Sequence, residues 1–266
     1  MAVAKRAPLR VLVKGTSLAT WVSFMGGPPT DFTYPRVVER ELLLSGRPAV
    51  VRNLAVTSEQ VKTGIKTWER QVFPWSPDVV VLHYGLYETV HLFLPHALER
   101  HVNSLRGRPG QVRDRYRRFA LRPTWKALAI AQQKADARIP TSVFRRKAAR
   151  LADDMERLVD RILFIGSPLV LLPETPPPGE RWATWFPGVG QRITMMNDAM
   201  AEVVSRFDRD NVRLFDTGAA LAPLVATGHD IVPDGAHYTA EAHDAIGRAM
   251  AREIGVWCDE HVPLHG

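Results

Sequence analysis

The 266-residue chain contains a single cysteine, Cys258, which excludes an intramolecular disulfide and any zinc site built on several thiolates. No stretch reaches the roughly 18 consecutive apolar residues of a membrane span, and no unit recurs at a fixed period. The first residues carry Lys5, Arg6 and Arg10 around only a short apolar run, so no signal peptide is expected. These absences predict a cytoplasmic protein, either free or bound peripherally to a membrane.

Acidic residues are nearly missing from Arg100–Arg150, which holds fifteen Lys or Arg residues and only Asp114 and Asp136. This segment has a net charge of +13, whereas the whole chain has +7 and the rest of it −6. Such a segment could bind an anionic membrane surface or an acidic partner such as a phosphopantetheine carrier protein. It could also bind nucleic acid nonspecifically, or form a solvated helical face. We expect no sequence-specific binding to nucleic acid.

Five short apolar runs, each bounded by turn residues, alternate with segments of helical periodicity. This alternation predicts an α/β fold with a mostly parallel five-stranded sheet covered by helices on both sides. The predicted strands are Val11–Val13, Ala49–Val51, Val79–Leu82, Leu169–Leu172 and Val212–Phe215. The predicted helical faces lie within residues 61–72, 148–162, 193–207 and 246–257. Open parallel sheets bind ligands beyond the carboxyl ends of their strands.

Two segments depart from this alternation. Residues 89–141 are too long for one helix and are interrupted by prolines, which predicts a basic helical insertion in an otherwise single domain spanning 1–266. Residues 173–190 combine three consecutive prolines with Trp182 and Trp185. These aromatic side chains could form a lid over a site, or they could pack the loop onto the body of the protein.

A candidate nucleophile follows the first predicted strand in the run Lys14-Gly15-Thr16-Ser17-Leu18. Gly15 permits a tight turn, and the backbone N–H groups after it can point at an anion. Ser17 could therefore attack a carbonyl carbon and also donate its N–H to the developing oxyanion. A serine in such a run could instead cap a helix.

A candidate base stands near the other end of the chain, in Asp234-Gly235-Ala236-His237, just before the last helical segment. A serine hydroxyl needs a base to take its proton, and an imidazole needs a carboxylate to fix its tautomer. His237 and Asp234, three residues apart on a turn, could supply these two groups. The alternative is an ordinary Asp turn followed by a histidine near a helix start.

Together the two runs resemble the SGNH hydrolases, also called the GDSL esterase and lipase family. The family's Gly-Asp-Ser-Leu block corresponds to Gly15-Thr16-Ser17-Leu18, and its Asp-x-x-His block to Asp234–His237. The resemblance covers essentially the whole chain and implies a three-layer α/β/α flavodoxin-like fold. It also implies Ser17 as nucleophile, His237 as base and Asp234 as the partner of the base.

The two middle blocks of the family are altered. Ser58 stands where the family has a glycine that donates its backbone N–H to the oxyanion. In Gly85-Leu86-Tyr87-Glu88, Tyr87 takes the place of the oxyanion-binding asparagine, and its hydroxyl could donate instead. Glu88 could orient a substrate hydroxyl or pair with a basic side chain. Loss of one oxyanion donor typically slows an enzyme by ~100 to 1,000-fold.

These residues predict a serine esterase or deacylase that cleaves an oxygen ester of a small or acylated substrate through an acyl-enzyme on Ser17. The resemblance implies no cofactor, and the spacing of the histidines favours no metal site. One alternative is an acyltransferase that uses the same three residues. The other is a binding protein that kept the fold but lost activity, since the asparagine of the third block is missing.

Overall fold

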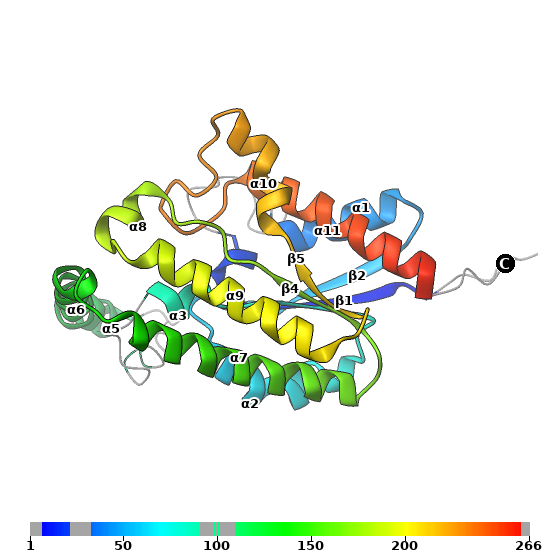
Figure 1. The fold of residues 1–266 in the computed structure, drawn as a ribbon, viewed down its shortest axis with the longest axis horizontal. Coiled ribbons are helices and arrows are strands. Elements are labelled where there is room, and N and C mark those ends of the chain that lie inside the picture. The colour runs from blue at the N-terminus through cyan, green and yellow to red at the C-terminus, as the bar shows by residue number, and fades with distance from the viewer. Residues whose placement is uncertain (1–6, 22–32, 91–97, 99–100, 102–109, 262–266) are drawn as a thin grey trace, which may run out of the picture.

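The computed structural model describes residues 7–21, 33–90, 98, 101 and 110–261, and its centre is a parallel five-stranded sheet (Figure 1). The order of the strands is β2-β1-β3-β4-β5, and every neighbouring pair is parallel. This is the flavodoxin-like order, so the predicted sheet is confirmed. The strands are β1 (Leu9–Gly15), β2 (Ala49–Asn53), β3 (Val79–His83), β4 (Leu169–Pro173) and β5 (Val212–Phe215).

Helices cover both faces of the sheet (Figure 1). Successive strand residues point to opposite faces, so Val11 and Val13 join one apolar core while Leu12 joins the other. The first core is closed by α1 (Tyr34–Leu44), α10 (Thr217–Ala226) and α11 (Ala240–His261). The second is closed by α2 (Val61–Gln71), α7 (Thr141–Phe164) and α9 (Val189–Phe207). The result is the expected three-layer architecture, to which α1 and α10 are unpredicted additions.

Short helices in the described residues between these elements include η1 (Ser17–Ala19), η3 (Phe73–Trp75), α3 (Leu86–Val90) and α8 (Glu180–Trp185). Both η1 and α3 begin within three residues of the end of a strand, so they stand at the carboxyl-end edge of the sheet. Among the helices that the structure describes, none is long and apolar enough to cross a membrane.

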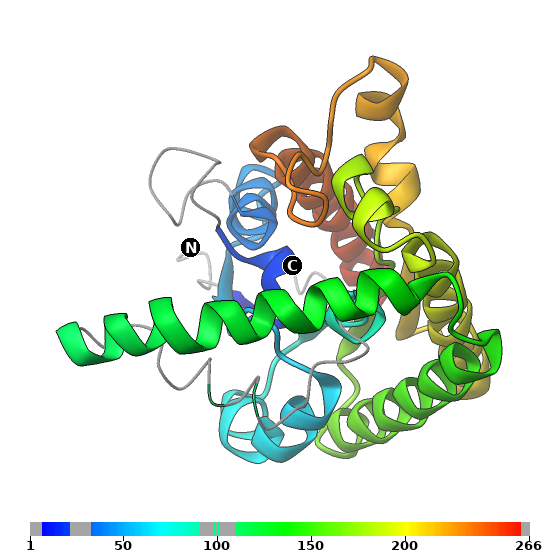
Figure 2. The same cartoon turned by 90° about the vertical axis from the view of Figure 1, so that its left-hand side faces the viewer.

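The basic segment contains one long helix, drawn in green across the front of Figure 2. It runs without a break through α5 (Gln111–Tyr116), the π-helical turn η4 (Arg117–Leu121) and α6 (Arg122–Asp136). We expected an interruption at Pro123, which has no N–H to donate to the preceding turn. The chain instead widens into the π-helical turn immediately before that proline and continues.

The end of α6 is fixed to the body by a buried ion pair. Arg192 Nη1 lies 2.8 Å from Asp136 Oδ1, and both side chains are almost fully buried. The other carboxylate oxygen of Asp136 accepts a hydrogen bond from the Gly188 N–H. Of the predicted insertion over 89–141, residues 91–97, 99–100 and 102–109 lie outside the described residues. That the segment is an insertion into a single domain stays a prediction.

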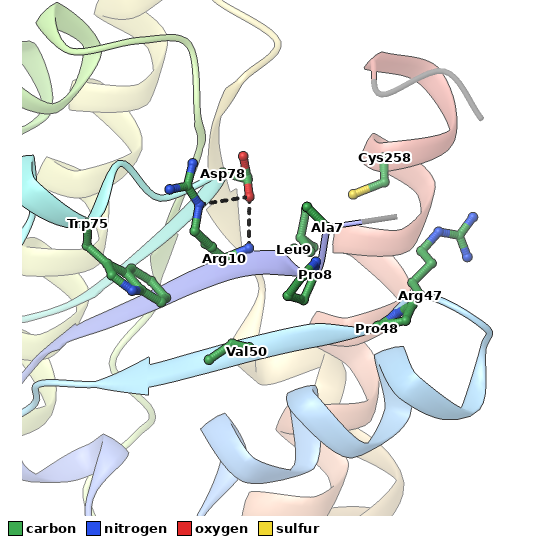
Figure 3. A pocket seen from close by; sticks show the side chains of 10 residues that line it. All are labelled: Ala7, Pro8, Leu9, Arg10, Arg47, Pro48, Val50, Trp75, Asp78 and Cys258. Atoms are coloured by element: carbon green, nitrogen blue, oxygen red, sulfur yellow. Dashed lines mark hydrogen bonds and ion pairs between the residues drawn. The ribbon is translucent and has the colours of Figure 1, made fainter. Parts of the chain in front are cut away.

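A cavity of about 680 Å³ opens at the amino ends of β1 and β2, where Arg10 and Asp78 lie on its wall (Figure 3). Asp78 Oδ2 accepts a hydrogen bond from the Arg10 N–H at 2.8 Å and pairs with the guanidinium of the same residue at 3.8 Å. Arg10 and Asp78 therefore engage each other, while Arg47, the other charged residue on the wall, pairs with Asp259. The cavity lies at the opposite edge of the sheet from Ser17.

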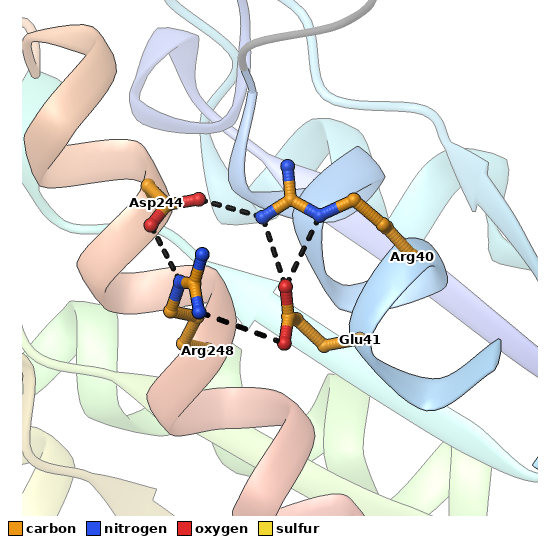
Figure 4. Close-up of polar contacts among 4 residues, drawn as sticks. All are labelled: Arg40, Glu41, Asp244 and Arg248. Atoms are coloured by element: carbon orange, nitrogen blue, oxygen red, sulfur yellow. Dashed lines mark hydrogen bonds and ion pairs between the residues drawn. The ribbon is translucent and has the colours of Figure 1, made fainter. Parts of the chain in front are cut away.

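The first and last long helices pack against each other, which brings distant parts of the chain together. A Cβ added to Gly247 of α11 would lie 2.4 Å from the Val37 Cβ of α1, so only glycine permits this approach. On the surface, Arg40 and Glu41 of α1 form a network of ion pairs with Asp244 and Arg248 of α11 (Figure 4). Exposed pairs contribute little each, so the apolar packing is the main stabilising contact.

Candidate active site

The turn after β1 sets the position of Ser17. Gly15 pairs in register with His83 of β3, and the Thr16 N–H donates to the His83 carbonyl at 2.9 Å. Gly15 has φ +151°, and a Cβ there would lie 2.1 Å from the His83 carbonyl oxygen. Only glycine fits at that position. Ser17, which is 7% exposed, follows as the first residue of η1, so its N–H has no acceptor within that helix.

Ser17, His237 and Asp234 lie in line at hydrogen-bonding distances. The Ser17 Oγ is 2.8 Å from His237 Nε2, and His237 Nδ1 is 2.6 Å from Asp234 Oδ2. The second oxygen of Asp234 accepts the backbone N–H groups of Ala236 and His237 at 2.9 and 2.8 Å. The carboxylate is therefore held by its own turn while it orients the imidazole.

The carboxyl group of Asp234 is ionised at neutral pH. Burial by itself would raise the pKa of Asp234. The hydrogen bonds from the His237 ring and from the two backbone N–H groups outweigh that effect and lower the pKa to about 2. An ionised Asp234 favours the Nδ1–H tautomer of His237, which leaves Nε2 free to accept the proton of Ser17.

Ser58 lies in the loop after β2 that is tied to the end of β1. The Leu54 N–H donates to the Val13 carbonyl at 2.8 Å, and the Val56 N–H donates to the Gly15 carbonyl at 3.0 Å. Ser58 is buried and has φ +63°, the left-handed conformation that favours glycine. This backbone geometry suits the glycine that the SGNH family has at this block. The role of Ser58 as an oxyanion donor stays a prediction.

A buried charge cluster next to Ser58 was missed by the sequence analysis. Lys14 Nζ lies 2.7 Å from Glu59 Oε1, with the two side chains only 1% and 6% exposed. The same ammonium donates to Gln71 Oε1 at 2.6 Å, and the Tyr84 hydroxyl donates to Glu59 Oε1 at 2.8 Å. The cluster therefore joins β1, the Ser58 loop, α2 and the segment after β3.

The third expected group of residues, Gly85, Tyr87 and Glu88, follows β3. Gly85 adopts φ +110°, and Tyr87 is buried in α3. Glu88 Oε1 accepts the N–H of Val61, the first residue of α2, at 3.2 Å. Burial raises the pKa of Glu88 to about 7. This contact gives Glu88 a structural role at α2, and the substrate-binding roles of all three residues stay predictions.

A second cluster that the sequence analysis missed lies behind His237. The rings of Tyr34, His83, Tyr238 and His243 are fully buried and contact one another. The Tyr34 hydroxyl lies 3.2 Å from His83 Nδ1, and the Tyr34 N–H donates to His243 Nδ1 at 3.1 Å. Burial lowers the pKa of both His83 and His243 to about 3. Both rings are neutral at pH 7, so they place no positive charge behind His237.

The loop after β4, which contains α8, packs onto the turn that holds Asp234. A Cβ on Gly235 would lie 2.5 Å from Trp182 Cδ1, so the indole of α8 rests directly against this turn. Trp182 therefore packs residues 173–190 onto the body of the protein, as one of our two interpretations predicted. Trp185 is partly exposed and lines a cavity of about 390 Å³ that also includes Val232 and Pro233, directly before Asp234.

The sequence matches no family model and no curated protein, whereas solved structures match over nearly the whole chain. A lipase/acylhydrolase from Enterococcus faecalis has a TM-score of 0.60 and 16% identity, covering 94% of this chain and 96% of that one. A carbohydrate acetylesterase from Sinorhizobium meliloti has a TM-score of 0.56 and 14% identity, covering 94% and 99%. At such identities the likeness shows a shared fold.

A catalytic mutant of Axe2, an acetylxylan esterase from Geobacillus stearothermophilus, is similar to the same extent. Its TM-score is 0.58 at 16% identity, and the match covers 93% of this chain and 94% of that one. The solved catalytic mutants of Axe2 replace a serine, an aspartate and a histidine, and that aspartate precedes the histidine by three positions.

Proposed function

We propose that this protein is a serine hydrolase that cleaves an oxygen ester through an acyl-enzyme on Ser17. The observation that carries the proposal is the line of hydrogen bonds from Ser17 Oγ through His237 to Asp234, at 2.8 and 2.6 Å. A hydroxyl so placed can lose its proton as it attacks, and the imidazolium that forms is stabilised by the ionised carboxylate.

In the first half of the reaction, the Ser17 oxygen attacks the acyl carbon while His237 Nε2 takes the hydroxyl proton. The backbone N–H groups of Ser17 and Ser58 are the proposed donors to the oxyanion, because both stand at the carboxyl-end edge of the sheet. Collapse of the tetrahedral intermediate breaks the ester C–O bond, and His237 returns its proton to the departing alcohol.

In the second half, water attacks the acyl carbon of the acyl-enzyme and His237 takes a proton from that water. The carboxylic acid leaves, Ser17 regains its proton from His237, and the free enzyme is restored. The printed names of the structural neighbours support an ester substrate, since they are a lipase/acylhydrolase, an acetylxylan esterase and a carbohydrate acetylesterase.

Labelling by a fluorophosphonate probe, read by mass spectrometry of the labelled peptide, tests the nucleophile. We expect one label, on Ser17, and none in Ser17→Ala. Hydrolysis of a short-chain chromogenic ester should fall by about 10⁴-fold or more in Ser17→Ala and in His237→Ala. Ser205→Ala, which changes an exposed serine of α9, is the matched control and should hydrolyse at the wild-type rate.

Equal rates in all four proteins, with no labelling of the folded wild type, would overturn the proposal and favour a binding protein. Addition of an alcohol such as a sugar to the assay separates hydrolysis from transfer. Formation of a new ester in preference to free acid would assign the same three residues to an acyltransferase.

A further inference from the structure

The first half of the long basic helix exposes three apolar or aromatic side chains. Val112 is 83% exposed and Phe119 is 71% exposed, and Tyr116 between them is partly exposed. Val112 and Tyr116 are four positions apart in α5 and lie on the same face, and Phe119 follows in the π-helical turn η4. Three exposed apolar or aromatic side chains within eight residues form an apolar stripe along the helix, whereas single exposed apolar residues are normal on any surface.

Arginines surround this apolar stripe. Residues Gln111–Arg122 contain five arginines and a single acid, Asp114, for a net charge of +4. The guanidinium of Arg118 lies 5.6 Å from the centre of the Phe119 ring. Arginine has a long apolar stem and a charged head, so these side chains can extend to phosphate groups while the apolar face is inserted beside them. The five are Arg113, Arg115, Arg117, Arg118 and Arg122.

The helix lies at the end of the molecule where the strands of the sheet finish. In Figure 1 α5 and α6 stand at the left, on the side of α3 and α8, and Figure 2 shows the helix crossing in front of that end. Its far end is anchored by the buried pair of Asp136 and Arg192. A surface bound by residues 111–122 would therefore lie on the same side of the molecule as Ser17.

We propose that residues 111–122 form a docking surface for an anionic lipid bilayer. A basic polar face beside a stripe of exposed apolar side chains is typical of helices that lie in the plane of a membrane interface. Phosphate contacts alone would explain the arginines, as in nonspecific binding to nucleic acid, but they leave Val112 and Phe119 in water. A bilayer accommodates both features, because headgroups pair with arginine while the acyl boundary takes up the apolar side chains.

Co-sedimentation with vesicles tests this proposal without any ester substrate, so its outcome is independent of the proposed hydrolase activity. The full-length protein should bind vesicles of phosphatidylcholine with about 30% phosphatidylglycerol, and should bind pure phosphatidylcholine far more weakly. Replacement of Arg115, Arg117 and Arg118 by glutamine should weaken binding by roughly 100-fold. Phe119→Ser should weaken it by roughly tenfold.

Two matched controls test whether vesicle binding depends on residues 111–122 or only on the overall charge and hydrophobicity of the protein surface. Lys66, Arg209 and Arg252 are exposed elsewhere, and their joint replacement by glutamine should leave vesicle binding near that of the wild type. Phe164 is 88% exposed at the end of α7, and Phe164→Ser should do the same. Apart from Arg117, which is half-buried, the replaced side chains are exposed, so all variants should melt within a few degrees of the wild type.

Three outcomes would overturn the proposal. The first is binding that is equal for anionic and neutral vesicles, or that does not change in the triple arginine variant. The second is binding that depends on the arginines but not on Phe119, together with equal binding to an oligonucleotide, which would assign the surface to nucleic acid. The third is no binding to vesicles but arginine-dependent binding to an acidic carrier protein, which would assign the surface to a protein partner.

Discussion

Removal of the Lys14 ammonium should destabilise the protein far more than removal of any surface cation. In Lys14→Met the carboxylate of Glu59 stays buried, 6% exposed, with the Tyr84 hydroxyl and without its cation. Breaking a buried pair by removing one partner typically costs about 3 to 5 kcal/mol. The exposed pair of Arg206 and Glu156, with side chains 45% and 37% exposed, provides the control, because such pairs contribute about 0 to 1 kcal/mol.

Equilibrium unfolding in urea measures this difference. With a slope of about 3 kcal/mol per molar urea, the Lys14→Met midpoint should fall by roughly 1 to 1.7 M, and the Arg206→Met midpoint by less than about 0.3 M. The double variant Lys14→Met with Glu59→Gln removes the unpaired charge and keeps an acceptor for Tyr84, so it should recover most of the loss. Equal midpoints for Lys14→Met and Arg206→Met would refute the reasoning.

Four other substitutions have defined outcomes. Gly15→Ala should lower the free energy of unfolding by more than about 2 kcal/mol, because the added Cβ meets the His83 carbonyl. Gly46 also has a positive φ but has nothing within 4 Å of an added Cβ, so Gly46→Ala should lower it by about 1 kcal/mol in the same urea assay. Ser58→Gly should retain ester hydrolysis, because the backbone N–H is kept. It should raise the urea midpoint slightly, because glycine adopts the left-handed conformation without strain. A loss of hydrolysis would instead assign the oxyanion-binding role to the Ser58 side chain. Burial raises the pKa of Glu88 from its ordinary 4.5 to about 7 in the folded protein, so folding favours the protonated carboxyl group. The wild type should therefore lose stability as the pH rises from 5 to 8. Melting curves of Glu88→Gln over the same pH range should not show this loss.

The centre of the sheet was predictable because its strands β3 and β4 are buried on both faces. Val79–His83 and Leu169–Pro173 are fully buried, so each appears in the sequence as a short uninterrupted apolar run between turn residues. Amphipathic periodicity gave the helices that close the second core. Helix α1 was missed because its apolar side chains, such as Val37, alternate with charged ones over only three turns.

In the candidate site, contacts between residues close in the sequence could be predicted, whereas contacts between distant residues could not. The contact between Asp234 and His237 is local, so the spacing of three residues on a turn already indicates it. The pairing of Lys14 with Glu59 joins residues that no local pattern connects, because the loop after β2 reaches it only once the sheet has formed. The buried rings around Tyr34 likewise come from distant parts of the chain, with His83 at the end of β3 and Tyr238 and His243 around the start of α11.

The hydrogen bond between Ser17 and His237 spans 220 positions, and this has a consequence for biosynthesis. A ribosome releases Ser17 long before it releases His237. Throughout that interval the hydroxyl of the growing polypeptide has no imidazole to accept its proton. On the proposed mechanism, Ser17 therefore becomes reactive only after His237 has been synthesised and α11 has packed against α1, so shorter nascent chains carry an ordinary, inert alcohol.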